Sequence, residues 1–353
     1  MNSRLQVGVV GCGVGQGHIH AYRSLAEQFD VVAVCDVDGA RAREVATRLE
    51  IPRVGTDLAD MCRMDDLDVI NVCTPSYLHS QQVLEVLAAG KHAVCEKPVA
   101  GSLKEVDELM QAEARSGRRV MPIFQARFGH GVQKLKFLIE GEVTGPAFLS
   151  TVETTWRRRA EYYASWHGKW ETELGGALVT LAIHSHDVLY YVLGPARNVF
   201  ARAATMVNPI ETEDCVSASL EMADGSFASL SVTTGSALEG SRLRFCFRNL
   251  TAESNARPYG HTADPWAFVG DSPELERQIE ERLSRFVPQP EGFAGQFTRF
   301  HQAVQQGTEL PVTLADARAA LELITAVYFS ARTEQVVRLP IGQAHPYYTG
   351  WLP

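Results

Sequence analysis

One lysine stands at a position suited to chemistry. Lys97 follows the short apolar run His92–Cys95 and precedes Pro98, in a chain with 6 lysines and 27 arginines. A strand buried in a parallel sheet directs its carboxyl end at the crevice where such sheets bind ligands. A lysine there would stabilise negative charge that develops on a reacting oxygen. We therefore predict that Lys97 is both catalytic and substrate-binding.

A second group of candidates lies in the segment GGALVTLAIHSHDVLYYVLG. If the segment is one helix, at about 100° per residue, Thr180, His184 and Asp187 share a face. Imidazole exchanges a proton near neutral pH, so we predict that His184 is a general acid/base oriented by Asp187. The alternative is a core histidine beside a surface acid. His186 falls on another side of the helix, so we predict no metal site.

An aromatic and cationic segment precedes this group. Its rings include Tyr162 and Trp166, and arginines occupy residues 157–159. Such a loop could stack on a sugar ring and bind its hydroxyls or a carboxylate; the alternative is a packed loop with solvated arginines. We predict that Tyr162, Trp166 and Thr180 contact substrate.

The first glycine-rich turn, GCGVGQG, resembles a phosphate-binding loop. Gly11 and Gly13 fit the first two positions of GxGxxG, but the third position is Gln16. We interpret the turn as one residue longer than usual, with Gly17 opening a helix whose N-terminus binds a pyrophosphate. The alternative is a tight turn without a ligand. The predicted cofactor residues of this turn are Gly11, Gly13, Val14, Gly15, Gln16 and Gly17.

Asp36 ends the next apolar run, about 23 residues beyond Gly13, where an acid accepts hydrogen bonds from the adenine-ribose hydroxyls. A carboxylate there repels a 2′-phosphate, which favours NAD over NADP. Arg41 and Arg43 leave NADP as the less favoured cofactor. The alternative is that Asp36 only caps the next helix.

The elements that must position these residues alternate through the first third of the chain. Short continuous apolar runs alternate with amphipathic helical patterns, which predicts a doubly wound parallel sheet over residues 1–124. Ser102 with Glu105 forms a capping box at the start of one of these helices.

From about residue 145 the strands alternate between apolar and polar residues, which predicts an α+β domain over residues 125–353 with a large, mostly antiparallel open sheet. One face carries Ser217, Ser219, Ser229 and Ser231 and is either solvated or covered by a partner subunit. We expect residues 249–272 to form an extended loop, followed by helices over 273–286 and from about Thr313.

The bulk composition limits the function classes. A chain of 353 residues predicts two domains. The net charge of −9 disfavours nucleic acid and anionic membranes as partners. No run approaches the roughly 20 apolar residues of a membrane span, and the N-terminus lacks a signal-peptide pattern. The 7 cysteines have no metal-type spacing, so we expect reduced thiols in the cytoplasm.

Several motifs together resemble the glucose–fructose oxidoreductase / inositol dehydrogenase / rhizopine catabolism family. The matching runs are VGVVGCG…GHIHAY, AVCDVD, NVCTPSYLH, CEKPVA, GGALVTLAIHSHDVLYYVLG, Glu213-Asp214, ARAALELITAVYFSA and VVRLP. The resemblance implies a Rossmann domain and a second domain whose open sheet forms the contact of a homodimer or homotetramer. It implies that Lys97 hydrogen-bonds the reacting hydroxyl and that His184 moves its proton. It also adds Thr74, Pro75, His79, Glu96 and Lys97 to the cofactor site and Arg127 to the substrate site.

The family usually has an aspartate where this chain has Thr180. We expect an NAD-dependent oxidoreductase that transfers hydride between nicotinamide and a secondary alcohol of a sugar, cyclitol or related polyol. One alternative is an enzyme with tightly bound, recycled NAD that catalyses a net epimerisation, hydrolysis or elimination. Another is a non-catalytic sugar or NAD sensor, which would be expected to lose catalytic residues.

Overall fold

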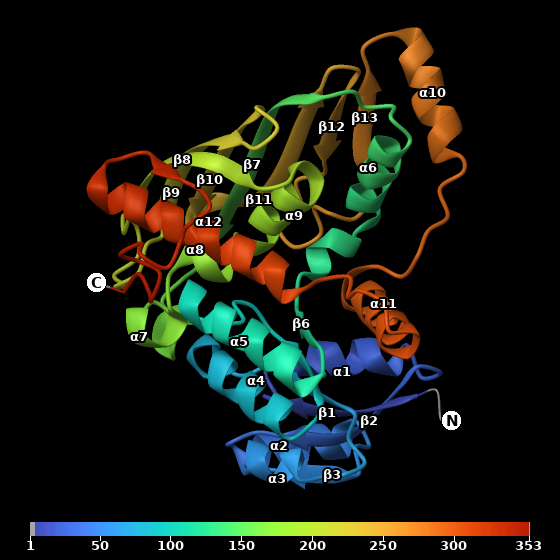
Figure 1. The fold of residues 1–353 in the computed structure, drawn as a ribbon, viewed down its shortest axis with the longest axis vertical. Helices are drawn as coiled ribbons and strands as arrows, with labels where there is room; N and C mark the ends of the chain where they lie inside the picture. The colour runs from blue at the N-terminus through green and yellow to red at the C-terminus, as the bar shows by residue number, and fades with distance from the viewer. Residues whose placement is uncertain (1–3, 353) are drawn as a thin grey trace. The chain divides into compact units, whose positions relative to one another are not determined.

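The computed structural model describes residues 4–352, which form two units of close internal contacts (Figure 1). The first unit comprises the described chain up to Phe124 together with Phe293–Arg318. The second comprises Gln125–Gly292 and the described chain from Ala319 onward. The prediction placed residues 293–318 in the second domain, and the structure assigns them to the first.

The first unit contains a six-stranded sheet with the order β3-β2-β1-β4-β5-β6, in which every neighbouring pair is parallel. This order reverses direction next to β1 and is that of a doubly wound dinucleotide-binding fold, as predicted. The strands are β1 (Leu5–Val10), β2 (Phe29–Cys35), β3 (Arg53–Gly55), β4 (Val69–Val72), β5 (His92–Cys95) and β6 (Val120–Pro122). The helices are α1 (Gly15–Arg23), α2 (Gly39–Arg48), α3 (Leu58–Cys62), α4 (His79–Ala88), α5 (Leu103–Ser116) and α11 (Gly292–Gln306).

Aromatic packing explains why α11 belongs to the first unit. Phe297 stacks on Tyr22 with ring centroids 4.1 Å apart, and Phe293 lies 4.3 Å from the ring of His18. Both partners are buried residues of α1. The aromatic face of α11 is therefore completed by residues that precede it by more than 250 positions, which the local sequence pattern could not indicate.

A glutamine of α11 also occupies the open edge of the sheet. Gln296 is fully buried; its Oε1 accepts the N–H of Phe124 at 3.1 Å, and its Nε2 donates to the carbonyl of Pro122 at 2.7 Å. These are the backbone groups that a further strand beside β6 would pair. Because unpaired buried backbone groups are costly, the side-chain amide stabilises the end of β6.

The second unit contains an eight-stranded sheet with the order β13-β12-β11-β7-β10-β9-β8-β14. Only the β10–β7 pair is parallel among the pairs of the described sheet, so the prediction of a mostly antiparallel sheet is confirmed. The strands are β7 (Ala147–Arg157), β8 (Ala196–Ala204), β9 (Cys215–Met222), β10 (Phe227–Thr233), β11 (Gly235–Phe247), β12 (Leu250–Ser254), β13 (Trp266–Gly270) and β14 (Val337–Arg338).

Helices pack against one face of this sheet. The longer ones are α6 (His130–Glu140), α9 (Ile183–Leu193), α10 (Pro273–Leu283) and α12 (Leu314–Thr333). Ser330 of α12 accepts the N–H of Ala201 in β8 at 2.9 Å, and Figure 1 shows α12 and α9 lying along the sheet. The opposite face carries the four serines as predicted; Ser217, Ser219 and Ser231 are exposed and Ser229 is half-buried.

The prediction of an extended loop over residues 249–272 was wrong. The segment contains β12 and β13, whose residues pair in antiparallel register from Leu250–Gly270 to Ser254–Trp266. The glycines and prolines that suggested a loop lie mainly between the two strands, around Pro258 and Pro265. The turn residues of this connection made the whole segment resemble a loop, although apolar and polar residues alternate in the strands on either side.

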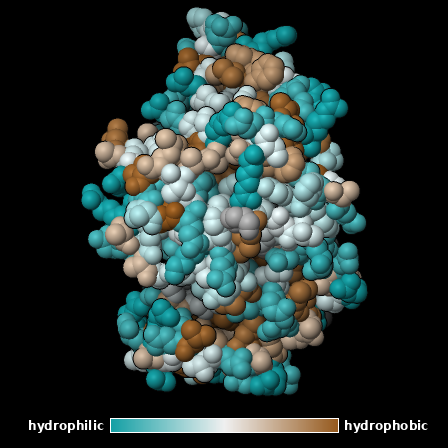
Figure 2. Space-filling model, turned by 90° about the vertical axis from the view of Figure 1, so that its left-hand side faces the viewer, coloured by the Kyte–Doolittle hydropathy of each residue, from teal (hydrophilic) through white to brown (hydrophobic). Residues whose placement is uncertain are grey.

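None of the helices in residues 4–352 is both long and apolar enough to cross a membrane. On the face drawn in Figure 2, hydrophilic residues are interspersed with hydrophobic ones. The cysteines Cys35, Cys73 and Cys95 are buried, as the apolar runs predicted.

The packing of α11 predicts a large stability effect. We expect Phe297→Ala to lower the free energy of unfolding of the first unit by about 3–5 kcal/mol, because it leaves a cavity against Tyr22. Urea unfolding measures the change, with Val37→Ala as a control because Val37 is 90% exposed. Equal effects of the two variants would contradict the assignment of α11 to this core.

Candidate active site

The glycine turn after β1 is forced by a close backbone approach. Gly11 has a φ of +93°, and a Cβ at this position would lie 2.3 Å from the carbonyl oxygen of Cys73. A side chain there would meet backbone that cannot move aside, so only glycine fits. Gly13 instead faces open space, with nothing within 4 Å of its would-be Cβ, which leaves room for a ligand beside the backbone.

The helix after this turn begins earlier than predicted. α1 starts at Gly15, not at Gly17, which lies inside the first turn of the helix. The side chain of Gln16 holds the loop, donating to the carbonyl of Cys12 at 2.6 Å and accepting from Arg48. The turn therefore presents the amides at the start of α1 in the manner that binds a pyrophosphate, and its residues fit a dinucleotide.

Asp36 lies directly after β2 and is 6% exposed. One carboxylate oxygen accepts the N–H of Cys12 at 2.8 Å; the other accepts the N–H of Asp38 at 2.9 Å and pairs with Arg41 at 2.8 Å. Burial opposes ionisation, but the two amides and the Arg41 guanidinium outweigh it and hold the pKa of Asp36 below its usual value. The α2 helix is capped by Asp38, so the helix-cap alternative for Asp36 is not what the structure shows.

Lys97 follows Glu96 after β5, and its side chain is half-buried. The Glu96 carboxylate accepts the N–H of Lys97 at 3.1 Å and lies 2.9 Å from Nε2 of the buried His18. The Nδ1 of His18 lies 2.8 Å from the Asn71 side-chain amide. Glu96 thus joins the turn that carries Lys97 to α1 and β4, a positioning role within the first unit.

Two further predicted cofactor residues, Thr74 and Pro75, follow β4 closely. The ring of His79 is buried between two backbone carbonyls, with Nδ1 2.7 Å from that of Pro98 and Nε2 2.7 Å from that of Thr74. Burial lowers the pKa of His79. This histidine ties the turn after β4 to the turn that holds Lys97, so it shapes both turns at the carboxyl edge of the sheet.

In the second unit, the predicted single helix is interrupted. α8 spans Ala177–Thr180 and α9 spans Ile183–Leu193. At the junction the N–H of Ala182 bonds to the carbonyl of Ala177 at 2.9 Å, five residues back, which widens the turn. The expectation that one continuous helix carries Thr180, His184 and Asp187 was therefore wrong.

A buried carboxylate sets where α8 begins. Glu213 accepts the N–H groups of Gly176 and Leu178, each at 2.9 Å, and the hydroxyl of Tyr328 at 2.7 Å. A Cβ on Gly176 would lie 1.9 Å from the carbonyl oxygen of Glu213, so this contact also requires glycine. Burial raises the pKa of Glu213 to about 7 against the lowering effect of these donors.

Asp187 forms an ion pair with Arg127 that sequence reasoning did not foresee. Arg127 Nε donates to one carboxylate oxygen at 2.7 Å and Nη2 donates to the other at 2.5 Å, and both side chains are buried. The guanidinium also lies 5.0 Å from the ring centre of Tyr191. The prediction treated Arg127 and Asp187 as separate substrate-site and catalytic residues, and the structure makes them one bidentate unit.

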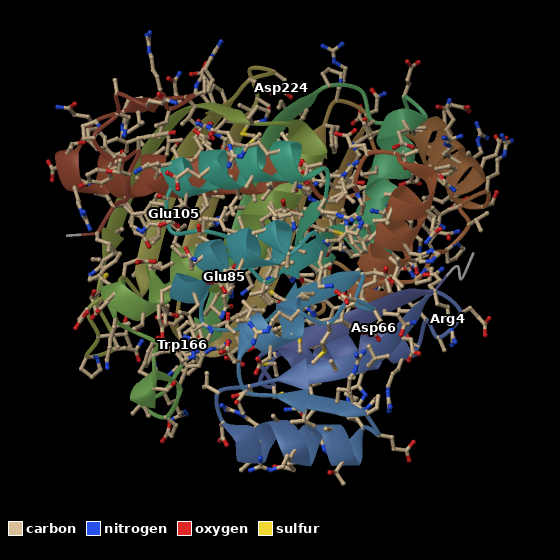
Figure 3. The ribbon with its side chains drawn as sticks, turned by 60° about the horizontal axis from the view of Figure 1, so that its bottom comes forward. Arg4, Asp66, Glu85, Glu105, Trp166 and Asp224 are labelled. Atoms are coloured by element: carbon tan, nitrogen blue, oxygen red, sulfur yellow. The ribbon has the colours of Figure 1, made fainter. Side chains whose placement is uncertain are left out.

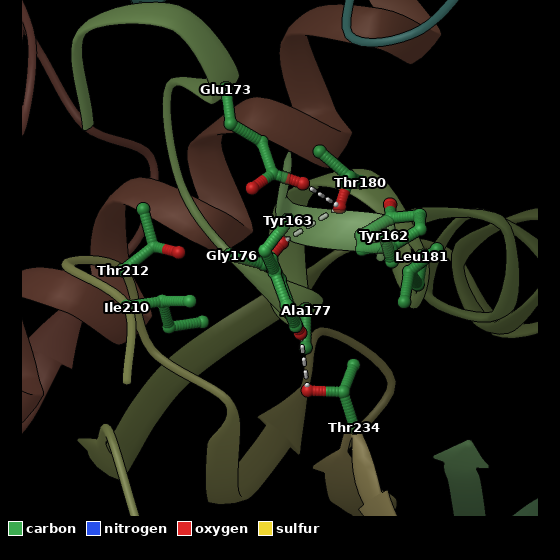
Figure 4. Close-up of a pocket in the computed structure, with 10 residues that line it drawn as sticks. All are labelled: Tyr162, Tyr163, Glu173, Gly176, Ala177, Thr180, Leu181, Ile210, Thr212 and Thr234. Carbon is green, nitrogen blue, oxygen red and sulfur yellow. Dashed lines mark hydrogen bonds between the residues drawn. The ribbon is translucent and has the colours of Figure 1, made fainter. Parts of the chain in front are cut away.

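Thr180 is held by a residue that the sequence analysis missed. Its hydroxyl lies 3.0 Å from a carboxylate oxygen of Glu173, which is 1% exposed. His167, 2.9 Å from the same oxygen, stacks on Tyr162 and lies against Trp166, which is labelled in Figure 3. The only sequence signal for Glu173 was an acid close before the Gly175–Gly176 pair. Tyr162 and Thr180, predicted substrate residues, share the pocket of Figure 4 with Glu173.

Glu213 predicts a pH dependence of stability. Its pKa is about 7 in the folded protein and 4.5 ordinarily, so the folded state binds more protons across this interval. Its contribution is complete below about pH 4.5 and is lost as the pH rises through 7. We expect the stability difference between wild type and Glu213→Gln to change by roughly 3 kcal/mol over this window, measured by urea unfolding. The exposed Glu276→Gln is the control; a pH-independent difference for Glu213→Gln would contradict the assignment.

Comparison with known proteins places these two units in one family. Residues 5–124 match the family described as "Oxidoreductase family, NAD-binding Rossmann fold", and residues 132–252 match "GFO/IDH/MocA C-terminal domain". The uncharacterized oxidoreductase YrbE of Bacillus subtilis is 28% identical over 305 residues, which cover 81% of this chain and 86% of that protein. Inositol 2-dehydrogenase of Burkholderia vietnamiensis is 29% identical over 235 residues, or 65% of each chain.

Among solved structures, the WlbA dehydrogenase from Bordetella pertussis, in complex with NADH and UDP-GlcNAcA, has a TM-score of 0.84 to this chain. It is 28% identical, and the match covers 96% of this chain and 100% of that one. The glycine turn and the six-stranded parallel order agree with the NAD-binding description of the first match. The chain therefore belongs to the GFO/IDH/MocA family of NAD-binding oxidoreductases.

Proposed function

We propose that this oxidoreductase transfers a hydride between the nicotinamide of NAD and a secondary alcohol of a sugar, cyclitol or related polyol. The observation that carries the proposal is the position of Lys97. It lies two residues beyond β5, at the same edge of the parallel sheet as the glycine turn after β1 and Asp36 after β2. Ligands of doubly wound sheets bind at this carboxyl edge.

The residues of the first unit fit NAD. The glycine turn leaves open space at Gly13 beside the start of α1, and Asp36 is an ionised acceptor after β2. We assign the pyrophosphate to the turn formed by residues 11–17 and the adenine ribose to Asp36, with Thr74, Pro75 and Glu96 bordering the nicotinamide end. When bound, NAD accepts or returns the hydride at carbon 4 of its nicotinamide.

Side chains of the protein would accept the proton of the reacting hydroxyl and stabilise the negative charge that develops on its oxygen. We assign Lys97 to hydrogen-bond the reacting hydroxyl and stabilise alkoxide character on its oxygen. We assign His184 to take the proton of that hydroxyl during oxidation. We assign Asp187 to position His184. The bidentate hydrogen bonds from Arg127 fix the Asp187 carboxylate, so Arg127 supports the site through Asp187.

The names of the relatives and the lining of one pocket support the proposed substrate class. One relative is named inositol 2-dehydrogenase, and the WlbA dehydrogenase structure is a complex with NADH and UDP-GlcNAcA. The second unit contains a pocket bordered by Tyr162, Tyr163 and several hydroxyls. Aromatic rings and hydroxyls side by side suit contact with part of a polyhydroxylated molecule, which supports a sugar or cyclitol as substrate.

We also propose that the serine-bearing face of the eight-stranded sheet forms a contact between copies of this chain. Large apolar side chains lie exposed on its strands: Leu149 of β7 sits opposite Phe227 of β10, and they are 44% and 57% exposed. Phe200 of β8 is a further exposed ring. A partner surface would remove these side chains from water.

The nucleotide assignment predicts a change of cofactor preference. We expect Asp36→Ala to weaken NAD binding roughly 10-fold and to improve NADP relative to NAD, because the ribose acceptor is lost and Arg41 no longer pairs with a carboxylate. Asp57→Ala is the matched control, since Asp57 caps α3 in another strand–helix turn of this sheet. Titration of both variants with each nucleotide measures the ratio; an unaltered preference in Asp36→Ala would refute the ribose contact.

The catalytic assignment predicts the effect of removing the lysine charge. We expect Lys97→Met to retain NAD binding and to lower turnover by roughly 100- to 1000-fold, since a preorganised donor to the reacting oxygen is lost. A panel of sugars, cyclitols and sugar acids, followed at 340 nm, provides the measurement. The exposed Lys104→Met is the control. Turnover close to wild type in Lys97→Met would contradict the role of this residue.

A further inference from the structure

We propose that the pocket of Figure 4 is a subsite for a single uncharged hydroxyl of the substrate, with Glu173 and Thr212 as its specificity-determining residues. The inference rests on the proposed function and adds to it which part of the polyol is recognised. All ten lining residues belong to the second unit. Glu173 and Thr180 are joined there by a hydrogen bond, and Thr212 faces them across the pocket.

The first element is the charge of a buried carboxylate. Glu173 has three fixed partners: the N–H of Gly168, Nδ1 of His167 at 2.9 Å and the hydroxyl of Thr180 at 3.0 Å. Burial and then the negative charge of Glu173 raise the pKa of Tyr162, whose phenol also hydrogen-bonds to Thr180. A chain of hydroxyls thus leads from the carboxylate to the pocket, polarised by one negative charge.

The second element is a hydroxyl that lacks a partner. Thr212 is 0% exposed, and its Oγ1 makes no hydrogen bond to any residue in the described part of the chain. The backbone of Thr212 is fixed on both sides, since its carbonyl accepts from Thr205 and its N–H bonds to Gly168. A buried hydroxyl without a partner costs free energy, and a ligand hydroxyl would supply the missing hydrogen bond.

The other residues that line the pocket limit which chemical groups can bind in it. Tyr163 and Thr234 are hydrogen-bonded to each other at 3.0 Å, and Ile210 and Leu181 supply apolar wall. The lining side chains leave no open space for a whole ring, and a single hydroxyl enters only where they shift by a small amount. A carboxylate or phosphate would be repelled by Glu173, because like charges at short range in a buried site are unfavourable. The geometry therefore points to a neutral hydroxyl of a sugar or cyclitol.

The test uses the full-length enzyme, two pocket variants and substrate pairs that differ by one hydroxyl. Glucose and myo-inositol are each compared with their monodeoxy analogues, and glucose with glucuronate, by titration calorimetry in the presence of NADH and by steady-state kinetics with NAD. We expect Thr212→Val to weaken binding of the hydroxylated compound roughly 10-fold and to leave one deoxy analogue within about 2-fold. We expect Glu173→Gln to raise KM more than it lowers kcat and to reduce the discrimination against glucuronate.

Controls separate this subsite from a structural role. Thr308→Val, at an exposed threonine, should leave all these constants unchanged, and NAD affinity and thermal stability of Thr212→Val should match wild type. If Glu173→Gln does not fold, the comparison of polyols with their deoxy analogues in Thr212→Val still tests whether the pocket binds a hydroxyl. Equal losses for a polyol and all its deoxy analogues would overturn the subsite, as would a wild-type enzyme that binds no polyol. Binding that depends on Thr212 without any NADH formation would instead support the subsite and refute the proposed function.

Discussion

The second unit depends on one buried carboxyl group, that of Glu213. Glu213 precedes β9 in the sequence, yet it accepts from the start of α8 and from Tyr328 of α12. It thereby fixes the Gly175–Gly176 turn between two secondary-structure elements that are distant in sequence. The position of Thr180, and through it that of the Glu173 carboxylate, follows from where this turn allows α8 to begin. Both oxygens of this one side chain accept, and together they hold two backbone N–H groups and a tyrosine hydroxyl.

Local patterns predicted those parts of the molecule that local forces determine. The continuous apolar runs became parallel strands, and the capping box at Ser102 formed with Glu105 (labelled in Figure 3), whose N–H bonds to Ser102 at 3.2 Å. Thr313 and Asp316 form a similar capping box where a helix was predicted to begin. The position of Asp36 directly after a strand was predictable, because the apolar run before it and the helical pattern after it mark where the strand ends.

Contacts between distant segments were not predictable in this way. Arg127 and Asp187 are 60 residues apart, and nothing in the periodicity of either segment specifies their pairing. The widened turn at Ala182 depends on a single backbone bond that leaves the apolar spacing of the segment unchanged. Glu173 was not predicted as a site residue, because only the folded structure shows that Thr180 and His167 bind the same oxygen of its carboxylate. For the same reason the sequence showed only that Thr180 replaces the family's usual aspartate, whereas in the structure the Glu173 carboxylate, at the end of a short helix, hydrogen-bonds to that threonine.

The glutamine at the edge of β6 has a practical consequence for work with fragments. A gene truncated after Phe124 would encode every strand of the nucleotide-binding sheet but would leave the backbone groups beside β6 and the aromatic residues of α1 uncovered. Exposed edges of this kind template pairing with other chains. An autonomous nucleotide-binding module made from this protein must therefore be discontinuous, with α11 grafted back by a designed linker or a circular permutation.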